Sequence, residues 1–164
     1  MRIANREKKW LQTIVSFQQQ KGSVFITAPV VFENNSSLLQ IFQALDFLTL
    51  QGITGASVYK NIHSMCNGAN LAYKRKMFYD VYGFVGIDKI ASGDDMLLMH
   101  KIWKQHPAKV HYLKSKEAIV STQPMKTWKS FFNQRIRWAS KARSYDDKRI
   151  FLVLLMVYLF NLSF

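Results

Sequence analysis

Two adjacent carboxylates are the residues of this chain best suited to acid–base chemistry. Asp94 and Asp95 follow Ser92 and Gly93 at the predicted start of a helix that runs to about Gln105. Repulsion between adjacent carboxylates makes one of them a better proton acceptor, which is what a general base requires. The same spacing also fits a structural role, with Ser92 as the N-cap and Asp95 completing a capping box.

A second candidate site lies on the helix predicted after Pro124, over residues 125–143. Helical spacing of i, i+3, i+4 and i+7 places four polar or aromatic side chains on one face: Gln134, Arg137, Trp138 and Lys141. The planar donors of an arginine suit phosphate oxygens, and an indole offers a flat surface to a sugar ring. The opposite side is predicted to be buried through Phe132, Ile136 and Ala139. The alternative is an interfacial helix whose tryptophan and basic residues meet lipid headgroups.

A third candidate is the run Asn67-Gly68-Ala69-Asn70, whose small residues allow a backbone to approach a ligand closely. A simple turn is the structural alternative. Nearby, His63 and Cys66 form an H-x-x-C pair, but no second pair follows, so a zinc site is not expected.

The net charge of +13 over 164 residues leaves three classes of partner: nucleic acid, a membrane surface or an anionic small molecule. Residues 101–164 carry 13 basic and 3 acidic side chains, so most of the excess lies in the C-terminal part. A nucleic-acid-binding domain would use the basic and aromatic residues of 126–143, but it gives no role to the acidic pair. A polymerase would hold that pair in a hairpin turn, whereas here it is predicted to begin a helix.

The last 15 residues, 150–164, carry no charge and read IFLVLLMVYLFNLSF. As a helix they would span about 22 Å, against a hydrocarbon core of about 30 Å. We therefore expect the beginning of a transmembrane helix over 149–164, with a buried terminal helix of a soluble domain as the alternative. Basic residues precede the segment, which predicts that the preceding domain lies on the cytoplasmic face of a membrane.

Helices and strands are predicted to alternate along the chain, which indicates an α/β fold. Helices are expected over 8–20, from 38 onward, and over 74–81, 92–105 and 125–143, and strands over 23–32, 65–73, 110–113 and 118–122. In the second helix, a core-facing stripe is predicted from Leu38, Ile41, Phe42, Leu45 and Leu48. Gly52 and Gly55 are expected to end that helix.

The order of these motifs resembles the C-terminal part of the catalytic domain of family 2 glycosyltransferases. The resemblance is to the processive, membrane-bound branch with the cellulose, chitin and hyaluronan synthases. It rests on Trp10-Leu11, Asn67-Gly68-Ala69-Asn70, Gly83-Phe84, Gly93-Asp94-Asp95 with Leu98, Gln134-x-x-Arg137-Trp138 and the apolar C-terminal segment.

The resemblance implies a GT-A fold, a nucleotide-diphosphate sugar donor, a glycan or lipid-linked acceptor, a divalent metal (Mg or Mn) and inversion at the anomeric carbon. By this resemblance, Asp95 is the general base and Asp94 its acidic neighbour. The diphosphate and the end of the acceptor would be held by Gln134, Arg137 and Trp138. The acceptor side of the pocket would be lined by Asn70, Gly68 and Ala69.

The chain departs from the family pattern in one respect. The metal-binding Asp-x-Asp should precede Trp10, and no Asp-x-Asp occurs in the sequence. We therefore expect residues 1–148 to be a partial catalytic domain that lacks the nucleotide-binding half and the metal ligands, followed by a membrane segment over 149–164. Such a chain is expected to have little or no transferase activity alone, and a noncatalytic membrane-associated remnant is the alternative. Membrane lipid is an expected partner, and nucleic acid is not.

Overall fold

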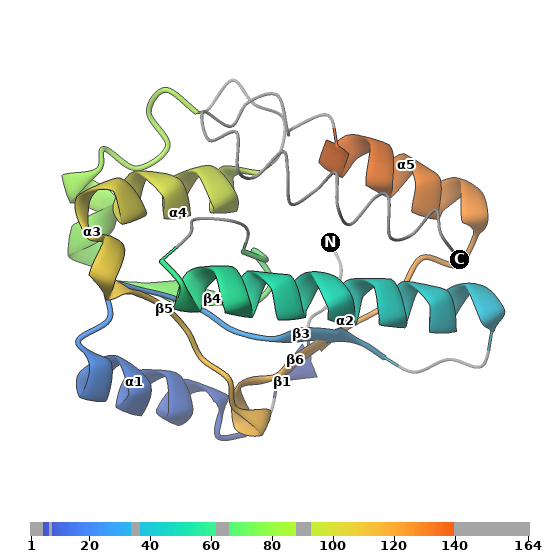
Figure 1. Ribbon diagram of the computed structural model, residues 1–164, viewed down its shortest axis with the longest axis horizontal. Coiled ribbons are helices and arrows are strands. Elements are labelled where there is room, and N and C mark those ends of the chain that lie inside the picture. The colour runs from blue at the N-terminus through green and yellow to red at the C-terminus, as the bar shows by residue number, and fades with distance from the viewer. Residues whose placement is uncertain (1–4, 7, 34–36, 62–65, 88–92, 140–164) are drawn as a thin grey trace.

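The computed structural model describes residues 5–6, 8–33, 37–61, 66–87 and 93–139 (Figure 1). Helices and short strands alternate along these residues, which confirms the predicted α/β class. One sheet has β2 (Phe25–Thr27) at its centre, with β4 (Leu71–Tyr73) antiparallel and β5 (Val110–Tyr112) parallel to it. In the other sheet, β6 (Val120–Thr122) lies between antiparallel β1 (Asn5–Arg6) and parallel β3 (Val30–Phe32).

Pro29 lies where the strand predicted over 23–32 divides into β2 and β3. A proline has no backbone N–H to donate to a sheet, so the hydrogen-bond ladder is interrupted at that residue. The chain then continues from one sheet into the next.

The two faces of the sheets carry different helices. On β2, Phe25 packs into a cluster with side chains of the second, third and fourth helices, whereas Ile26 packs with Ile14 of α1 (Trp10–Lys21). This alternation is the period of two that a strand imposes. Helix α1 ends at Gly22, whose φ of 63° is left-handed, as the sequence predicts for a glycine at that position.

The helices on the other face are α2 (Leu38–Tyr59), α3 (Arg75–Asp80) and α4 (Asp94–Gln105), and α5 (Trp128–Ala139) packs on α2. Two short 3-10 turns complete the described elements, η1 (Pro107–Lys109) and η2 (Lys116–Ala118). Figure 1 shows α1 below the strands, and α4 and α5 above α2.

Helix α2 differs from its prediction in both length and orientation. It continues through Gly52 and Gly55 to Tyr59, because packing on the strands outweighs the low helix propensity of two glycines. At Gly55, a Cβ would stand 3.3 Å from the Tyr112 ring, so the glycine allows β5 to approach the helix. The predicted core stripe is also wrong: its five side chains are 37–79% exposed, and the buried residues are Leu39, Gln43, Phe47, Thr54, Ser57 and Val58.

Helix α5 likewise turns a different side to the core than predicted. Phe132 and Ile136 are 56% and 67% exposed, so the prediction that this side is buried is wrong for both residues. The buried side contains Phe131 and Gln134, because α2 is the surface on which α5 packs. The burial of Ala139 lies outside what the structure describes.

Within the described residues, no helix is both long and apolar enough to cross a membrane. The segment predicted to do so, 149–164, and Lys141 lie outside those residues.

Candidate active site

The acidic pair begins α4, as predicted, but its cap is different. The N-cap is Gly93, with a left-handed φ of 96°, so the prediction of Ser92 as N-cap is wrong, and Ser92 itself lies outside the described residues. Asp94 is exposed, and Asp95 is half-buried with its Oδ1 accepting a hydrogen bond of 2.9 Å from the Met96 backbone N–H. Two carboxylates in the first turn interact favourably with the helix dipole.

Gly68 brings the third candidate motif against the first. A Cβ on Gly68 would stand 2.7 Å from Asp95 Oδ2, so the carboxylate packs directly on the glycine backbone. Cys66, two residues earlier, lies in the same neighbourhood. The pKa of its thiol is raised well above its ordinary value, chiefly by burial and then by the negative charges of Asp95 and Asp94. The exposed loop at Gly68 and Ala69 and the start of α4 therefore form one site.

Asn70, at the end of that motif, is fully buried and holds the fold together. Its Nδ2 donates to the carbonyls of Pro29 (2.6 Å) and Ala118 (2.7 Å), and its Oδ1 accepts from Trp10 Nε1 (3.0 Å). These contacts tie α1, the β2–β3 connection and η2 to the loop that carries Gly68. The observed role of Asn70 is structural, and its predicted ligand contact stays a prediction.

The second candidate motif divides between a buried and an exposed part. Gln134 is buried, and its Oε1 has no hydrogen-bond partner among the described residues. Trp138 is half-buried, with its ring centroid 6.3 Å from that of Phe47 on α2. Arg137 is exposed. An unpaired amide oxygen and an exposed arginine on neighbouring turns are polar groups that a ligand could use.

Arg135 lies within the same motif but was assigned no role by the sequence analysis of that helix. It forms an ion pair with Asp46 of α2, and its guanidinium lies 4.5 Å from the Trp138 ring centroid and 4.9 Å from that of Phe131. Burial lowers the pKa of Arg135, and the Asp46 carboxylate opposes that shift. The indicator in the sequence was Asp46 itself, because it is the one charged residue in α2. One face of the Trp138 indole is therefore covered by Arg135.

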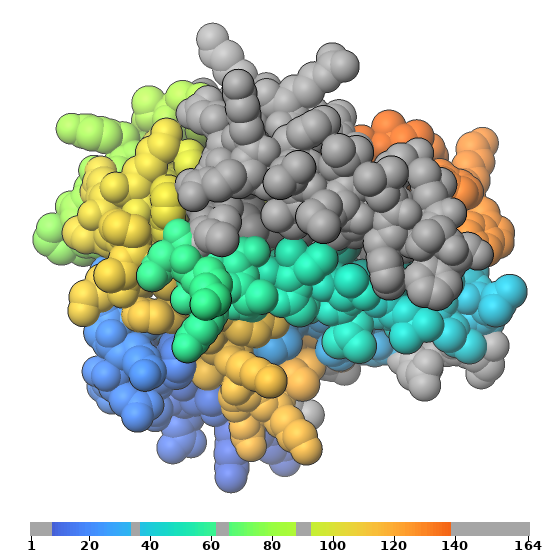
Figure 2. Space-filling view, viewed as in Figure 1, coloured from blue at the N-terminus to red at the C-terminus, as the bar shows by residue number. Residues whose placement is uncertain are grey.

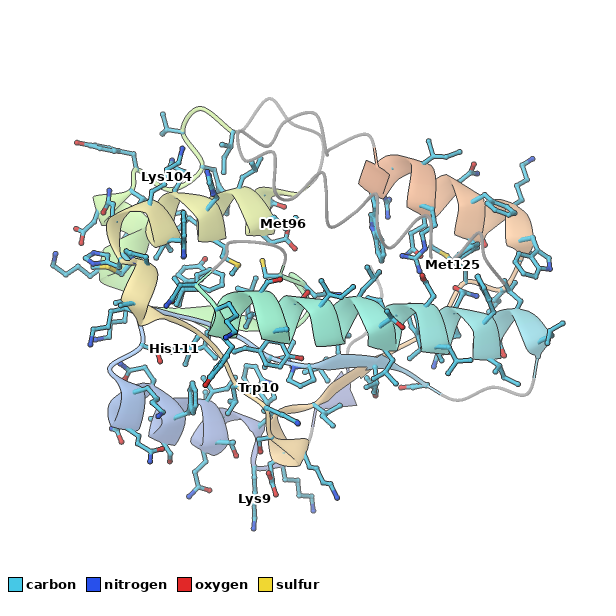
Figure 3. All side chains as sticks on the ribbon, in the orientation of Figure 1. Lys9, Trp10, Met96, Lys104, His111 and Met125 are labelled. Atoms are coloured by element: carbon cyan, nitrogen blue, oxygen red, sulfur yellow. The ribbon has the colours of Figure 1, made fainter. Side chains whose placement is uncertain are left out.

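The first turn of α4 and the last turn of α5 point toward each other above α2 (Figure 1). Figure 3 labels Met96 at that end of α4 and Met125 in the turn before α5. Phe47 contacts Trp138, and Val58 packs in the cluster that holds Leu98 of α4. Because Phe47 and Val58 are eleven positions apart, the contact of α2 with Trp138 and its contact with α4 lie about 16 Å apart along the helix. All three candidate motifs thus lie over one side of the sheets.

A divalent metal is implied by the resemblance, but the described residues do not fit one. They contain no group of three or more His, Cys, Asp or Glu side chains that could hold an ion. Asp94 and Asp95 are adjacent carboxylates of one helical turn, and no third His, Cys, Asp or Glu side chain of the described residues joins them.

Comparison with known proteins gives one match. A family model described as Glycosyl transferase family group 2 matches residues 7–164, and so includes all three motifs. Neither the search of curated proteins nor the search of solved structures produced a match.

Proposed function

This chain belongs to glycosyl transferase family group 2, and on that basis we propose the acceptor-side chemistry of its site. The reaction is transfer of a sugar from a nucleotide-diphosphate donor to a hydroxyl of a glycan or lipid-linked acceptor, with inversion at the anomeric carbon. The membership itself supports glycosyl transfer in general. The donor, the acceptor and the synthase-like branch belong to the proposal.

The observation that carries the proposal is the approach of Asp95 to Gly68. Two motifs that lie 27 positions apart in the sequence are in van der Waals contact, with 2.7 Å between Asp95 Oδ2 and the position of a Cβ on Gly68. A base must be held within hydrogen-bond reach of the proton that it accepts, and the glycine lets the carboxylate lie against the backbone of an exposed loop. The hydrogen bond from Met96 N–H to Asp95 Oδ1 orients the carboxylate and leaves Oδ2 at the loop.

Asp95 accepts the proton of the acceptor hydroxyl as that oxygen attacks the anomeric carbon of the donor. The new carbon–oxygen bond forms on the face opposite the diphosphate. The bond from the anomeric carbon to the diphosphate oxygen breaks, and the nucleoside diphosphate leaves with the electron pair. Because the described residues do not fit a metal site, no step is assigned to a metal here.

Substrate binding is assigned to the second motif. Arg137 is exposed and supplies a fork of donors for the diphosphate. The unpaired Oε1 of Gln134 accepts a hydrogen bond from the end of the acceptor, and Trp138 offers its indole to the sugar ring. Arg135 acts as a positioning residue, because it fixes the Trp138 ring from one side while paired with Asp46.

We propose that the protein acts at a membrane, with its catalytic part on the cytoplasmic side, because segment 150–164 is uncharged and basic residues precede it. Since no Asp-x-Asp occurs in the sequence, we expect the purified 164-residue chain to transfer little sugar by itself. Rapid transfer by that chain alone would contradict this expectation.

The test is an Asp95→Asn substitution at the native gene, so that any partner chain is retained. Membranes from these cells are assayed for transfer from radiolabelled nucleotide sugars, and photoaffinity labelling of the chain measures donor binding. We expect transfer to be lost and donor binding to persist. The matched control is Asp80→Asn, an exposed aspartate on α3 that pairs with Lys76 and lies outside the site. Unchanged transfer in Asp95→Asn membranes would assign the base to another residue.

A further inference from the structure

Helix α2 differs from an ordinary helix on the surface of a domain in the residues on its exposed side. Its buried side holds both apolar and polar residues (Leu39, Gln43, Phe47, Thr54, Ser57 and Val58), whereas its outer side holds large apolar residues. Helices at a water-facing surface place apolar residues inward and charged residues outward. The outer side of α2 therefore favours a surrounding other than water.

The outer side of α2 is also uncharged along its whole length. Asp46 is the helix's one charged residue, and its carboxylate is paired with Arg135. The atoms of α2 can be followed along the molecular surface from end to end in Figure 2. A 22-residue helix at the surface whose one charged residue is paired is unusual for a protein in which one residue in five is charged.

The apolar surface continues from α2 onto α5. Phe42 of α2 contacts Trp128, with ring centroids 6.0 Å apart, and Trp128 stacks on Phe132 at 6.0 Å. Ile136 follows one turn later and is exposed. We call the resulting surface the α2–α5 apolar face; it consists of Leu38, Ile41, Phe42, Leu45, Leu48, Trp128, Phe132 and Ile136.

Basic residues lie beside this face. Lys126, Lys129 and Arg137 are exposed on α5 or the turn before it, and a tryptophan lies among them. Apolar side chains that include a tryptophan, with lysine or arginine around them, match the layers of a bilayer surface, in which acyl chains lie below anionic headgroups. We propose that the α2–α5 apolar face rests in the surface of an anionic lipid bilayer.

A second copy of the chain is a less suitable occupant. Two apolar faces could pack together, but each chain carries a net charge of +13, and the repulsion opposes a symmetric pair. An anionic lipid surface instead attracts the same charge. The inference deepens the membrane part of the proposed function and rests on it for its biological setting, although its test needs no transfer activity.

The test compares two leucines of equal exposure on opposite sides of the sheets. Leu45 on α2 is 62% exposed and Leu11 on α1 is 63% exposed. In the full chain with Cys66→Ser, Leu45→Cys or Leu11→Cys is labelled with an environment-sensitive dye. The labelled proteins are mixed with vesicles of phosphatidylcholine and phosphatidylglycerol that contain brominated acyl chains.

We expect the dye at position 45 to shift to the blue and to be quenched by the brominated chains, and the dye at position 11 to stay in water. Anchoring through residues 150–164 alone would leave both dyes in water and would overturn the inference. Emission from position 45 that is already blue-shifted without vesicles, or that shifts with protein concentration, would show that protein covers the face and would also overturn it.

A charge-matched pair of variants tests the basic border. The double variant Lys126→Gln/Lys129→Gln should weaken binding to the anionic vesicles about thirtyfold, because each lysine near such a surface raises the affinity about five- to sixfold. The control Lys114→Gln/Lys116→Gln removes the same charge from exposed lysines near α1 and should have little effect. Equal losses in both variants would assign the binding to overall charge and not to this face. Neither result alters the outcome of the Asp95 transfer assay, so the two proposals fail separately.

Discussion

Replacing Gly68 with alanine moves the carboxylate of Asp95 while leaving every hydrogen-bonding group in place. The new methyl carbon would stand 2.7 Å from Asp95 Oδ2, 3.3 Å from its Cγ and 3.4 Å from its Cβ. Ordinary contacts of this kind begin at 3.4 Å, so Oδ2 must withdraw by about 0.7 Å. The backbone of Gly68 is outside the left-handed region, so alanine adopts it without strain.

The expected effect on rate is much larger than the effect on stability. A reacting group displaced by about 1 Å can lose on the order of a hundredfold in rate, so we expect Gly68→Ala to lower sugar transfer about 10- to 100-fold. The steric conflict is between the end of the Asp95 side chain and a residue of an exposed loop, and alanine restricts the unfolded chain, so the free energy of unfolding should change by less than about 1 kcal/mol.

The assay measures initial transfer rates at saturating nucleotide sugar in membranes from cells that carry the variant gene, together with urea unfolding of the purified chain. Gly52→Ala is the matched control, because a Cβ at Gly52 meets no atom within 4 Å. It should stabilise α2 by up to about 1 kcal/mol and leave transfer unchanged. Full activity in the Gly68 variant, or equal loss in both variants, would refute the argument that Gly68 positions the base.

Three further predictions concern titration and packing. Asp95→Asn should lower the pKa of the Cys66 thiol, because it removes a negative charge that raises it; the pH midpoint of iodoacetamide alkylation at the chain's single cysteine measures this. Gln43→Ala should cost about 2–4 kcal/mol in urea unfolding, since buried Gln43 pairs with both the N–H and the C=O of Met125, whereas Gln40→Ala on the same helix should cost little. Burial, and then two nearby lysines, lower the pKa of His111, so the folded chain resists its protonation. Stability should therefore fall as the pH drops below about 6.5, where the unfolded chain binds that proton, and His111→Gln should reduce this loss between pH 7.5 and 5.5.

Local chain geometry accounts for the elements that could be predicted. Gly22 ends α1 in a left-handed conformation, and Pro29 divides a β-rich stretch where it cannot donate a hydrogen bond. Both effects depend on a single residue type and its neighbours. Helix α3, expected over 74–81, is observed over Arg75–Asp80.

The orientation of α2 could not be predicted, because periodicity shows that a helix has two sides but not which side meets the protein. The prediction that its apolar stripe faces the core assumes that water covers the rest of the helix. The structure instead buries Leu39, Gln43 and Phe47 and leaves that stripe exposed. Phe132 and Ile136 of α5 are exposed against prediction in the same way, because the spacing again left open which side of the helix meets the protein.

Within a candidate motif, one residue is buried and paired while its neighbour is exposed, and sequence spacing cannot show which is which. The side chain of Asn70 forms hydrogen bonds to three segments of the chain. These bonds hold the loop on which Gly68 contacts Asp95. On α5, Arg135 pairs with Asp46, whereas Arg137 is exposed. Because partners such as Asp46 come from distant parts of the chain, only the fold shows that Arg135 is the arginine of this motif that pairs with α2.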